Sequence, residues 1–417
     1  MNTAAHIKSN QHADAITTSI LVADKFDGSG LDTLMALGHE VISDPSLDID
    51  SLPQAIATHN PGVVVVRSTK VSAQAIDAGS NLELIVRAGA GIDNIDVDAA
   101  SRRGVFVSNC PGRNSIAVAE LVWGLILACD RRIPDQVSDL RNNIWKKKEY
   151  SKAQGLHGRT LGIVGLGRIG KEIASRGKAF GMRVIAWSRS LDQQSADAMG
   201  VDYCESLLNL VRLSDVVSVS VTANQETKNL LDEECIMALK PGAYLVNASR
   251  GSVIDQNALA NAVKENGVRA GLDVFANEPG AGDDTFSDEI VQLPGVYGTH
   301  HVGASTDQAQ KAIAEKTVEI IRTHLETGET LNCVNLASET GNAVLMVRHY
   351  NRPGVLAHVF YLLGQSGINV EEMTNVIYQG GDAACARIRL SSSLNAEQLK
   401  AIRTNEHVLA ASVTGMS

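Results

Sequence analysis

A glycine-rich segment in the middle of the chain most strongly limits what this sequence can fold into. Residues 161–170 read LGIVGLGRIG, an apolar run that predicts a β-strand, and residues 171–180 predict a helix. Between strand and helix, Gly165 permits a tight turn, Gly167 lets the backbone approach a pyrophosphate, and Gly170 lets the helix pack closely on the strand. The segment therefore predicts a dinucleotide-binding unit whose helix N-terminus supplies amide donors to phosphate.

Short apolar runs alternate with amphipathic stretches on both sides of this segment. Strands are expected at residues 20–23, 63–66, 84–88 and 105–108, and again at 161–164, 183–187, 215–221, 243–247 and 268–273. This spacing predicts βαβ units and an α/β fold of two doubly wound parallel-sheet lobes. Two longer helices are expected to join the lobes, one over 116–130 with Ser115 as its N-cap, the other over 306–327 and ending at Gly328.

The pattern changes after a polar stretch near residue 335. Strands at 343–349, 368–378, 383–390 and 408–413 and helices at 353–366 and 396–404 follow in the order βαββαβ. That order predicts a small ferredoxin-like domain. The expected divisions are a disordered leader over 1–18, a first lobe over 19–115 and 308–330, a nucleotide-binding Rossmann lobe over 116–307, a linker over 331–342, and the small domain over 343–417.

Composition excludes several classes of partner. The 417 residues carry a net charge of −10, which argues against nucleic acid or an anionic membrane as the main partner. The six cysteines are widely spaced and form no metal-binding pattern, so no metal site is expected. The polar N-terminus carries no secretory signal, and no apolar run is long enough for a membrane span. We expect a cytoplasmic protein.

The end of the second strand of the nucleotide lobe bears on cofactor choice. An NAD site usually has an acidic residue there, which binds the ribose hydroxyls. This chain instead reads Ser188-Arg189. A hydroxyl and a guanidinium suit a 2′-phosphate, so the cofactor is NAD or NADP, with NADP favoured.

Three further groups lie in loops after predicted strands, where open α/β sheets assemble their sites: Arg250, Glu278 and His301. With the glycine segment and the stretches RAGAGIDN (87–94), NASRG (247–251), LDVF (272–275) and HVGAST (301–306), the chain resembles the D-isomer-specific 2-hydroxyacid dehydrogenases. Within that family it is most similar to the branch that oxidises 3-phosphoglycerate. The resemblance implies that the first lobe binds substrate and the second binds nucleotide.

The resemblance implies a role for each member of this set. His301 is the expected general acid/base, which exchanges a proton with the C2 hydroxyl. Glu278 is expected to orient His301 and favour its imidazolium, and Arg250 to clamp the substrate carboxylate. The family usually has proline in the place of His300, so His301 is the better match.

Other matched positions are assigned to ligands in the same way. Substrate is expected at Arg67, Arg87, Ala88, Gly89, Ala90, Gly91 and Asn114, the two arginines binding its phosphate, with Lys70 a weaker candidate. Cofactor is expected at Gly165, Gly167, Arg168, Ile169, Gly170, Ser188, Arg189, Ala248, Arg250, Asp273 and Gly303. The run Trp145–Lys148 either adds positive charge to a neighbouring subunit's site or is a solvated helix face.

The small domain resembles an ACT domain in its segments NRPGVL (351–356) and GINV (367–370). ACT domains pair across subunits and bind small amino acids. His349, Asn351 and Asn369 match the contacts of a regulatory L-serine site, since an asparagine side chain can both donate and accept hydrogen bonds. The alternative is an ACT fold that serves dimerisation alone.

Together these observations predict a homo-oligomeric dehydrogenase, a dimer or tetramer. It would oxidise a small phosphorylated 2-hydroxy acid, 3-phosphoglycerate, with feedback inhibition by serine. One alternative is a dehydrogenase for another D-2-hydroxy acid, such as a glyoxylate, hydroxypyruvate or 2-oxoglutarate reductase. Another is a non-catalytic protein that senses nucleotide while contacting partners, as some corepressors resembling this family do.

Overall fold

Short strands of β-branched and aliphatic residues build the first of three sheets. The computed structural model describes residues 18–279, 285–337 and 341–415, so the expected leader lies, apart from residue 18, outside the described residues. The chain divides into two compact units, Met1–Asn335 and Leu336–Ser417. The first sheet of unit 1 is parallel, in the order β2-β1-β3-β4-β5, and consists of β1 (Ser19–Val22), β2 (Glu40–Ser43), β3 (Val63–Val66), β4 (Leu84–Arg87) and β5 (Phe106–Asn109).

The second sheet of unit 1 is also parallel and has the strand order of a Rossmann sheet extended by one strand, β12-β11-β10-β9-β6-β7-β8. Its strands are β6 (Thr160–Val164), β7 (Arg183–Trp187), β8 (Asp202–Tyr203), β9 (Val216–Val219), β10 (Tyr244–Asn247), β11 (Arg269–Leu272) and β12 (Val296–Gly298). The strand order reverses between β6 and β9, and open sheets of this kind bind ligands at such a switch point. The turn of the predicted glycine segment, residues 165–167, lies there, directly after β6.

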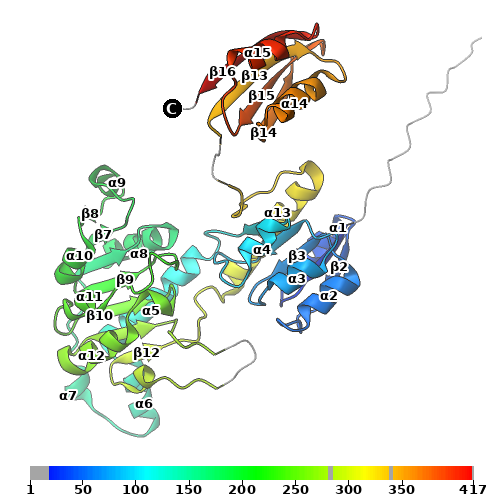
Figure 1. The fold of residues 1–417 in the computed structure, drawn as a ribbon. Helices are drawn as coiled ribbons and strands as arrows, with labels where there is room; N and C mark the ends of the chain where they lie inside the picture. The colour runs from blue at the N-terminus through cyan, green and yellow to red at the C-terminus, as the bar shows by residue number, and fades with distance from the viewer. Residues whose placement is uncertain (1–17, 280–284, 338–340, 416–417) are drawn as a thin grey trace, which may run out of the picture. The chain divides into compact units, whose positions relative to one another are not determined.

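Helices cover both faces of each of these two parallel sheets (Figure 1). Alternate residues of one strand enter different cores because side chains of a strand point to opposite faces: Leu21 packs on one side of the first sheet and Ile20 on the other. The helices beside the first sheet are α1 (Gly28–Ala36), α2 (Leu52–His59), α3 (Ala73–Ala78) and α4 (Val97–Arg102). Those of the second sheet are α8 (Arg168–Ala179), α9 (Gln193–Ala198), α10 (Leu207–Leu213), α11 (Glu233–Met237) and α12 (Gln256–Asn266).

Two long helices occur where the sequence predicted them. Helix α5 (Ser115–Arg131) packs against the second sheet, and α13 (Asp307–Thr327) returns to the first, where Ile313, Ile320 and Ile321 are buried. Helix α13 ends at Gly328, which has a φ of +74°. The N-cap of α5 is Asn114, one residue before the expected Ser115, and its side chain makes no capping hydrogen bond.

Unit 2 has the βαββαβ order that the sequence predicted. Its elements are β13 (Ala343–Tyr350), α14 (Val355–Gln365), β14 (Val370–Ile377), β15 (Ala383–Leu390), α15 (Ala396–Arg403) and β16 (Val408–Gly415). The sheet is antiparallel, in the order β14-β15-β13-β16. The fold class, two parallel α/β sheets followed by a small ferredoxin-like domain, is confirmed.

The structure differs from the predictions in three strands at the sheet edges and in the linker. Strands β2, β8 and β12 were not predicted, because each is short and lies at the edge of its sheet with little apolar pattern. Residues 331–335, expected in the linker 331–342, pack on β5 instead. The Val334 amide donates to Val107 O at 2.8 Å, and Asn335 Oδ1 accepts from the Val107 amide at 2.8 Å.

Among the described residues, no helix is both long and apolar enough to cross a membrane.

Two glycines give a matched test of this packing. Gly165 has a φ of +94°, and a Cβ there would lie 2.5 Å from the Ser220 carbonyl oxygen. We expect Gly165→Ala to destabilise the protein by about 1–3 kcal/mol and to lower the melting temperature. Gly124, inside α5, has no heavy atom within 4 Å of an added Cβ, so Gly124→Ala should raise stability by about 0.5–1 kcal/mol. Calorimetry that finds both variants equally stable would contradict this account.

Candidate active site

The loop between β6 and α8 has the geometry of a pyrophosphate-binding turn. Gly165 has a positive φ and lies against Ser220. A Cβ at Gly170 would lie 2.2 Å from the Gly165 carbonyl oxygen. A Cβ at Gly167, by contrast, would meet no heavy atom within 4 Å. Open space beside Gly167 and the amides of the first turn of α8 fit the diphosphate of NAD or NADP.

The other residues expected at the cofactor lie around the same edge of the second sheet. Arg168, in the first turn of α8, reaches the turn between β5 and α5, where a Cβ at Gly112 would lie 2.5 Å from its Cδ. Ile169 is half-buried beside it, and Ala248 directly follows β10.

The ribose end of the site contains a residue that the sequence analysis missed. Ser188 and Arg189 follow β7, and the Arg189 guanidinium forms an ion pair with Glu226. Glu226 belongs to the loop after β9. The sequence offers a weak signal for it, the segment NQET (224–227), since asparagine and threonine favour tight turns.

His301 and Glu278 lie in contact, as predicted. His301 Nδ1 lies 2.8 Å from Glu278 Oε2, and Glu278 Oε1 accepts a hydrogen bond from the Phe275 amide at 3.0 Å. Burial opposes ionisation of Glu278, but these hydrogen bonds and the positive charge of Arg250 outweigh it and lower its pKa. Glu278 is therefore an anion at neutral pH, able to stabilise an imidazolium.

Asp273 fixes the loop that carries His301. Its side chain is only 1% exposed, and Oδ1 accepts from Thr299 Oγ1 at 2.6 Å and from the Val302 amide at 2.9 Å. Oδ2 accepts from the Gly303 amide at 2.9 Å. His301 itself has a φ of +53°, an uncommon backbone conformation for a residue with a side chain. The buried carboxylate holds the loop in that conformation; its expected contact with nicotinamide stays a prediction.

Arg250 reaches the first lobe through Asp93. Arg250 Nη2 donates to Asp93 Oδ1 at 3.0 Å and Nε to Oδ2 at 3.2 Å, while Nη1 donates to the Ser249 carbonyl at 2.7 Å. The hydrogen bonds from Arg250 lower the pKa of Asp93. Asp93 lies in the stretch 87–94 that carries the resemblance, but the sequence alone does not indicate that it pairs with Arg250. Its carboxylate shows that Arg250 can bind a carboxylate with two parallel hydrogen bonds.

Arg87 and Arg67 add positive charge near Arg250. Arg87 is half-buried, and its Nε has no hydrogen-bond partner among the residues that the structure describes. Burial, followed by repulsion from Arg250 and Arg67, lowers the pKa of Arg87. Arg67 Nη2 donates to Ser305 Oγ at 3.2 Å. Three neighbouring guanidiniums with Asp93 as a counter-charge favour an anionic ligand.

The loop after β4 is held by its backbone and lies beside Arg250. Backbone groups of Ala88, Gly89 and Ala90 form hydrogen bonds of 2.6–2.8 Å with residues of β3 and the end of β5. A Cβ at Gly91 would lie 2.4 Å from Arg250 Nη2. The structure thus brings the expected carboxylate-binding loop of one lobe next to the arginine of the other.

Two other expected substrate contacts differ in their surroundings. Asn114 precedes α5, and its Oδ1 is buried with no hydrogen-bond partner in the described part of the chain. A buried amide oxygen without a partner is costly, so a ligand hydroxyl or ammonium there would be favourable. Lys70, the weaker candidate, is exposed.

The three residues expected to bind serine do not meet within one chain. Asn351 precedes α14, where its Nδ2 donates to the Gly381 carbonyl at 2.9 Å. Asn369 follows the helix and lies at the other end of β15: the Asn351 amide donates to the Asp382 carbonyl just before β15, and the Asn369 carbonyl accepts from the Ser391 amide just after it. Asn369 Nδ2 donates to Glu371 at 3.2 Å. His349 is buried and contacts Asn375 Oδ1 through Nε2 at 3.2 Å.

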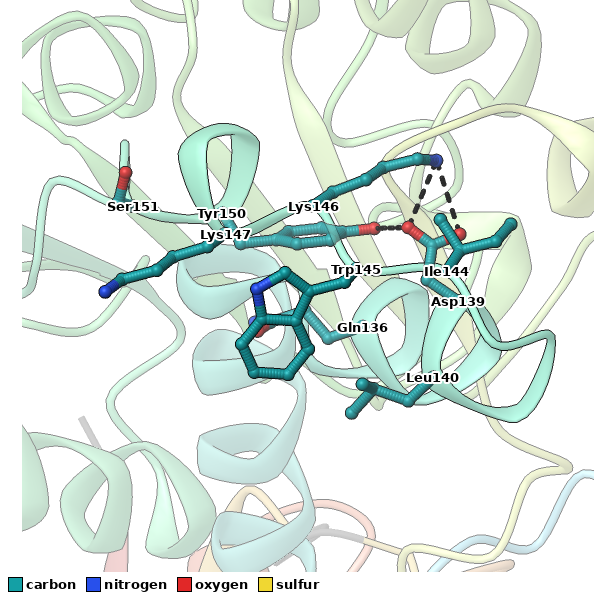
Figure 2. A pocket seen from close by; sticks show the side chains of 9 residues that line it. All are labelled: Gln136, Asp139, Leu140, Ile144, Trp145, Lys146, Lys147, Tyr150 and Ser151. Atoms are coloured by element: carbon teal, nitrogen blue, oxygen red, sulfur yellow. Dashed lines mark hydrogen bonds and ion pairs between the residues drawn. The ribbon is translucent and has the colours of Figure 1, made fainter.

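A cavity of about 310 Å³ lies on helices α6 (Ile133–Arg141) and α7 (Lys147–Tyr150), and none of the candidate site residues lines it. Figure 2 shows Tyr150 and Lys146 directed at Asp139, to which they bind at 2.6 and 3.1 Å. Trp145 is 78% exposed at its edge. We call α6, α7 and the residues between them the arm; polar contacts fix its shape, and its apolar side chains face outward.

Among the described residues, no group of three or more histidine, cysteine, aspartate or glutamate side chains is arranged to hold a metal ion.

Comparison with known proteins agrees with this geometry. Residues 123–303 match the family model described as D-isomer specific 2-hydroxyacid dehydrogenase, NAD binding domain. A D-3-phosphoglycerate dehydrogenase of Methanocaldococcus jannaschii is 38% identical over 319 residues, 76% of this chain and 59% of that protein. A hydroxypyruvate reductase of Thermotoga maritima is 39% identical over 302 residues, 72% of this chain and 96% of that protein. The chain thus spans only about three-fifths of the phosphoglycerate dehydrogenase.

Solved structures give the same result. A protein of Thermus thermophilus superposes with a TM-score of 0.68 at 32% identity, covering 76% of this chain and 99% of that one. An NADPH-dependent glyoxylate/hydroxypyruvate reductase of Sinorhizobium meliloti, in complex with NADP and malonate, superposes with a TM-score of 0.66 at 29% identity, covering 76% of this chain and 96% of that one. With the glycine loop, Arg250 and the Glu278–His301 pair in place, the chain belongs to the D-isomer specific 2-hydroxyacid dehydrogenase family.

Proposed function

We propose that this protein is an NAD(P)-dependent D-3-phosphoglycerate dehydrogenase, which oxidises C2 of 3-phosphoglycerate to give 3-phosphohydroxypyruvate, the first step of serine biosynthesis. The observation that carries the proposal is the positive charge around one loop: the guanidiniums of Arg87 and Arg250 lie against Gly89 and Gly91, and Arg67 reaches Ser305, four residues after His301. A substrate with both a carboxylate and a phosphate suits that charge. The rival is a glyoxylate or hydroxypyruvate reductase, supported by the Thermotoga relative; its substrate lacks the phosphate.

His301 acts as the general base in this proposal. When bound, the nicotinamide supplies the acceptor for the hydride of C2. As the C2–H electrons leave and the C2–O bond becomes a carbonyl, His301 takes the hydroxyl proton on Nε2, since Nδ1 faces Glu278. The Glu278 carboxylate stabilises the imidazolium formed, and in ketone reduction the same proton returns to the substrate oxygen.

The arginines bind and orient the substrate. Arg250 exchanges the Asp93 carboxylate for that of the substrate, which needs the same pair of parallel hydrogen bonds. Arg67 and Arg87 hold the phosphate. The backbone of residues 88–91, beside Arg250, supports the carboxylate from the other side.

We also propose that L-serine binds unit 2 at His349, Asn351 and Asn369 as a feedback inhibitor. Asn351 and Asn369 flank α14, so one chain does not present both to one small ligand. If two copies pack with their α14 helices side by side and antiparallel, Asn351 of one copy comes close to Asn369 of the other. The proposed serine site therefore requires a homo-oligomer.

The arm supports the homo-oligomer independently. Leu140 and Trp145 are 55% and 78% exposed on a segment whose shape is fixed by polar contacts. Large apolar side chains exposed on a segment of fixed shape are typical of subunit interfaces, because the segment loses little conformational freedom on docking. Lys146, Lys147 and Lys148 on the same arm would then come near the partner, whether or not they reach its substrate.

The acid/base assignment is tested by two adjacent histidines. His301→Gln should lower kcat roughly 10²- to 10⁴-fold, because proton transfer is lost, while the Kd for NADH, from fluorescence titration, stays unchanged. His300→Gln, at the exposed neighbouring position, should keep wild-type turnover. If His300→Gln abolishes turnover and His301→Gln does not, the assignment is wrong. A protein that binds NADH but turns over no 2-oxo acid would be a sensor.

The substrate assignment is tested by Arg67→Ala. We expect kcat/KM for 3-phosphohydroxypyruvate to fall about 10²- to 10³-fold, because a charged hydrogen-bond partner of the phosphate is lost. Activity on hydroxypyruvate should stay within about threefold. Arg102→Ala, which removes an exposed arginine of α4, is the charge-matched control. An equal loss on both substrates would favour the unphosphorylated rival.

The serine site is tested by Asn369→Ala in the full chain. The variant should need at least about tenfold more serine for half-inhibition, because a donor and an acceptor for the ligand are removed, while uninhibited turnover is retained. Gln365→Ala, at the exposed end of α14, is the control. Sedimentation of both variants should show the wild-type oligomer. Unchanged inhibition of Asn369→Ala would rule out the site, and an active, serine-sensitive monomer would rule out the two-copy arrangement.

A further inference from the structure

An acidic side chain from another loop lies beside the segment that follows β7. Ser188 occupies the position where an acid usually meets the cofactor ribose, and Arg189 follows it. Glu226, from the loop after β9, pairs with Arg189. We infer that Glu226 determines cofactor specificity: it neutralises Arg189 and disfavours a 2′-phosphate, so that the protein prefers NAD to NADP. The inference rests on the proposed use of a nicotinamide cofactor.

Local hydrogen bonds hold Glu226 in this place. Asn224 Oδ1 accepts from the Glu226 and Thr227 amides, both at 3.0 Å. Thr227 is buried, and its Oγ1 donates to the Thr222 carbonyl at 2.7 Å. The backbone of the turn is therefore fixed on both sides of Glu226, which keeps Glu226 within reach of Arg189.

The fold does not depend on the ion pair. The Arg189 and Glu226 side chains are 62% and 68% exposed, and ion pairs this exposed contribute little to stability. The residues that shape the turn are Asn224 and Thr227, which substitution of Glu226 leaves unchanged. Variants at Glu226 should fold as the wild type does, so a change in binding reports on the site.

The pair affects the two cofactors differently. An unphosphorylated ribose presents hydroxyls, which can donate to the Glu226 carboxylate or accept from Arg189 without separating them. A 2′-phosphate carries about two negative charges and must compete with Glu226 for Arg189, while Glu226 remains close as a like charge. The inference therefore runs against the NADP preference expected from Ser188 and Arg189 alone.

The test is direct binding of NADH and NADPH by fluorescence titration, without substrate. Wild type should bind NADH more tightly. Glu226→Gln should lower the Kd for NADPH about 5- to 20-fold, because repulsion is removed and Arg189 is released, and should leave the Kd for NADH within about twofold. Glu233→Gln, which removes an exposed acid at the start of α11 in the same lobe, should change neither.

A second variant shows whether the tighter NADPH binding of Glu226→Gln depends on Arg189. In the Arg189→Gln background, Glu226→Gln should improve NADPH binding by less than half the factor seen alone, because no guanidinium remains to be released. An equal change for both cofactors, or none, while the protein still reduces 3-phosphohydroxypyruvate, would overturn the inference and leave the proposed function standing. Failure of wild type to bind either cofactor would overturn both.

Discussion

The buried carboxylate of Asp273 positions the chemistry of this site. It directly follows β11, and it accepts three hydrogen bonds from the loop that follows β12, at Thr299, Val302 and Gly303. A buried carboxylate is stable only when its oxygens accept hydrogen bonds. The loop supplies these hydrogen bonds, and they in turn hold the loop in its conformation. His301 can then hold a positive φ and present its ring to Glu278. Removal of this one anion would release the loop as well as a hydrogen-bond network.

Much of the fold could be predicted because its signals are local. The glycine segment identified β6, the turn and α8 together, since each glycine has a distinct steric role there. The βαββαβ order of unit 2 followed from alternating apolar runs. Strands β2, β8 and β12 could not be predicted, because their pairing depends on a neighbouring strand rather than on their own residues.

The contact between His301 and Glu278 could be predicted, but two other ion pairs of the candidate site could not. Arg250, Glu278 and His301 stood out by their positions after strands and by resemblance. Asp93 and Glu226 did not stand out, because the sequence does not show which arginine the fold places beside an acidic loop residue. The packing of residues 331–335 on β5 was missed for the same reason: polar residues predict a linker unless a strand edge with unpaired backbone groups is known to be available.

These two acids have the same physical effect at opposite ends of the proposed site. Asp93 binds Arg250, which would bind the substrate carboxylate. Glu226 binds Arg189, which would bind the 2′-phosphate of the cofactor. Unpaired arginines in clefts attract any anion, so a paired arginine binds only ligands that offer better geometry or more charge than the acid they displace. The substrate carboxylate can match Asp93 with two parallel hydrogen bonds. A ribose hydroxyl need not displace Glu226 at all. An arginine paired with an acid can therefore accept the substrate carboxylate at Arg250 and yet discriminate against a 2′-phosphate at Arg189.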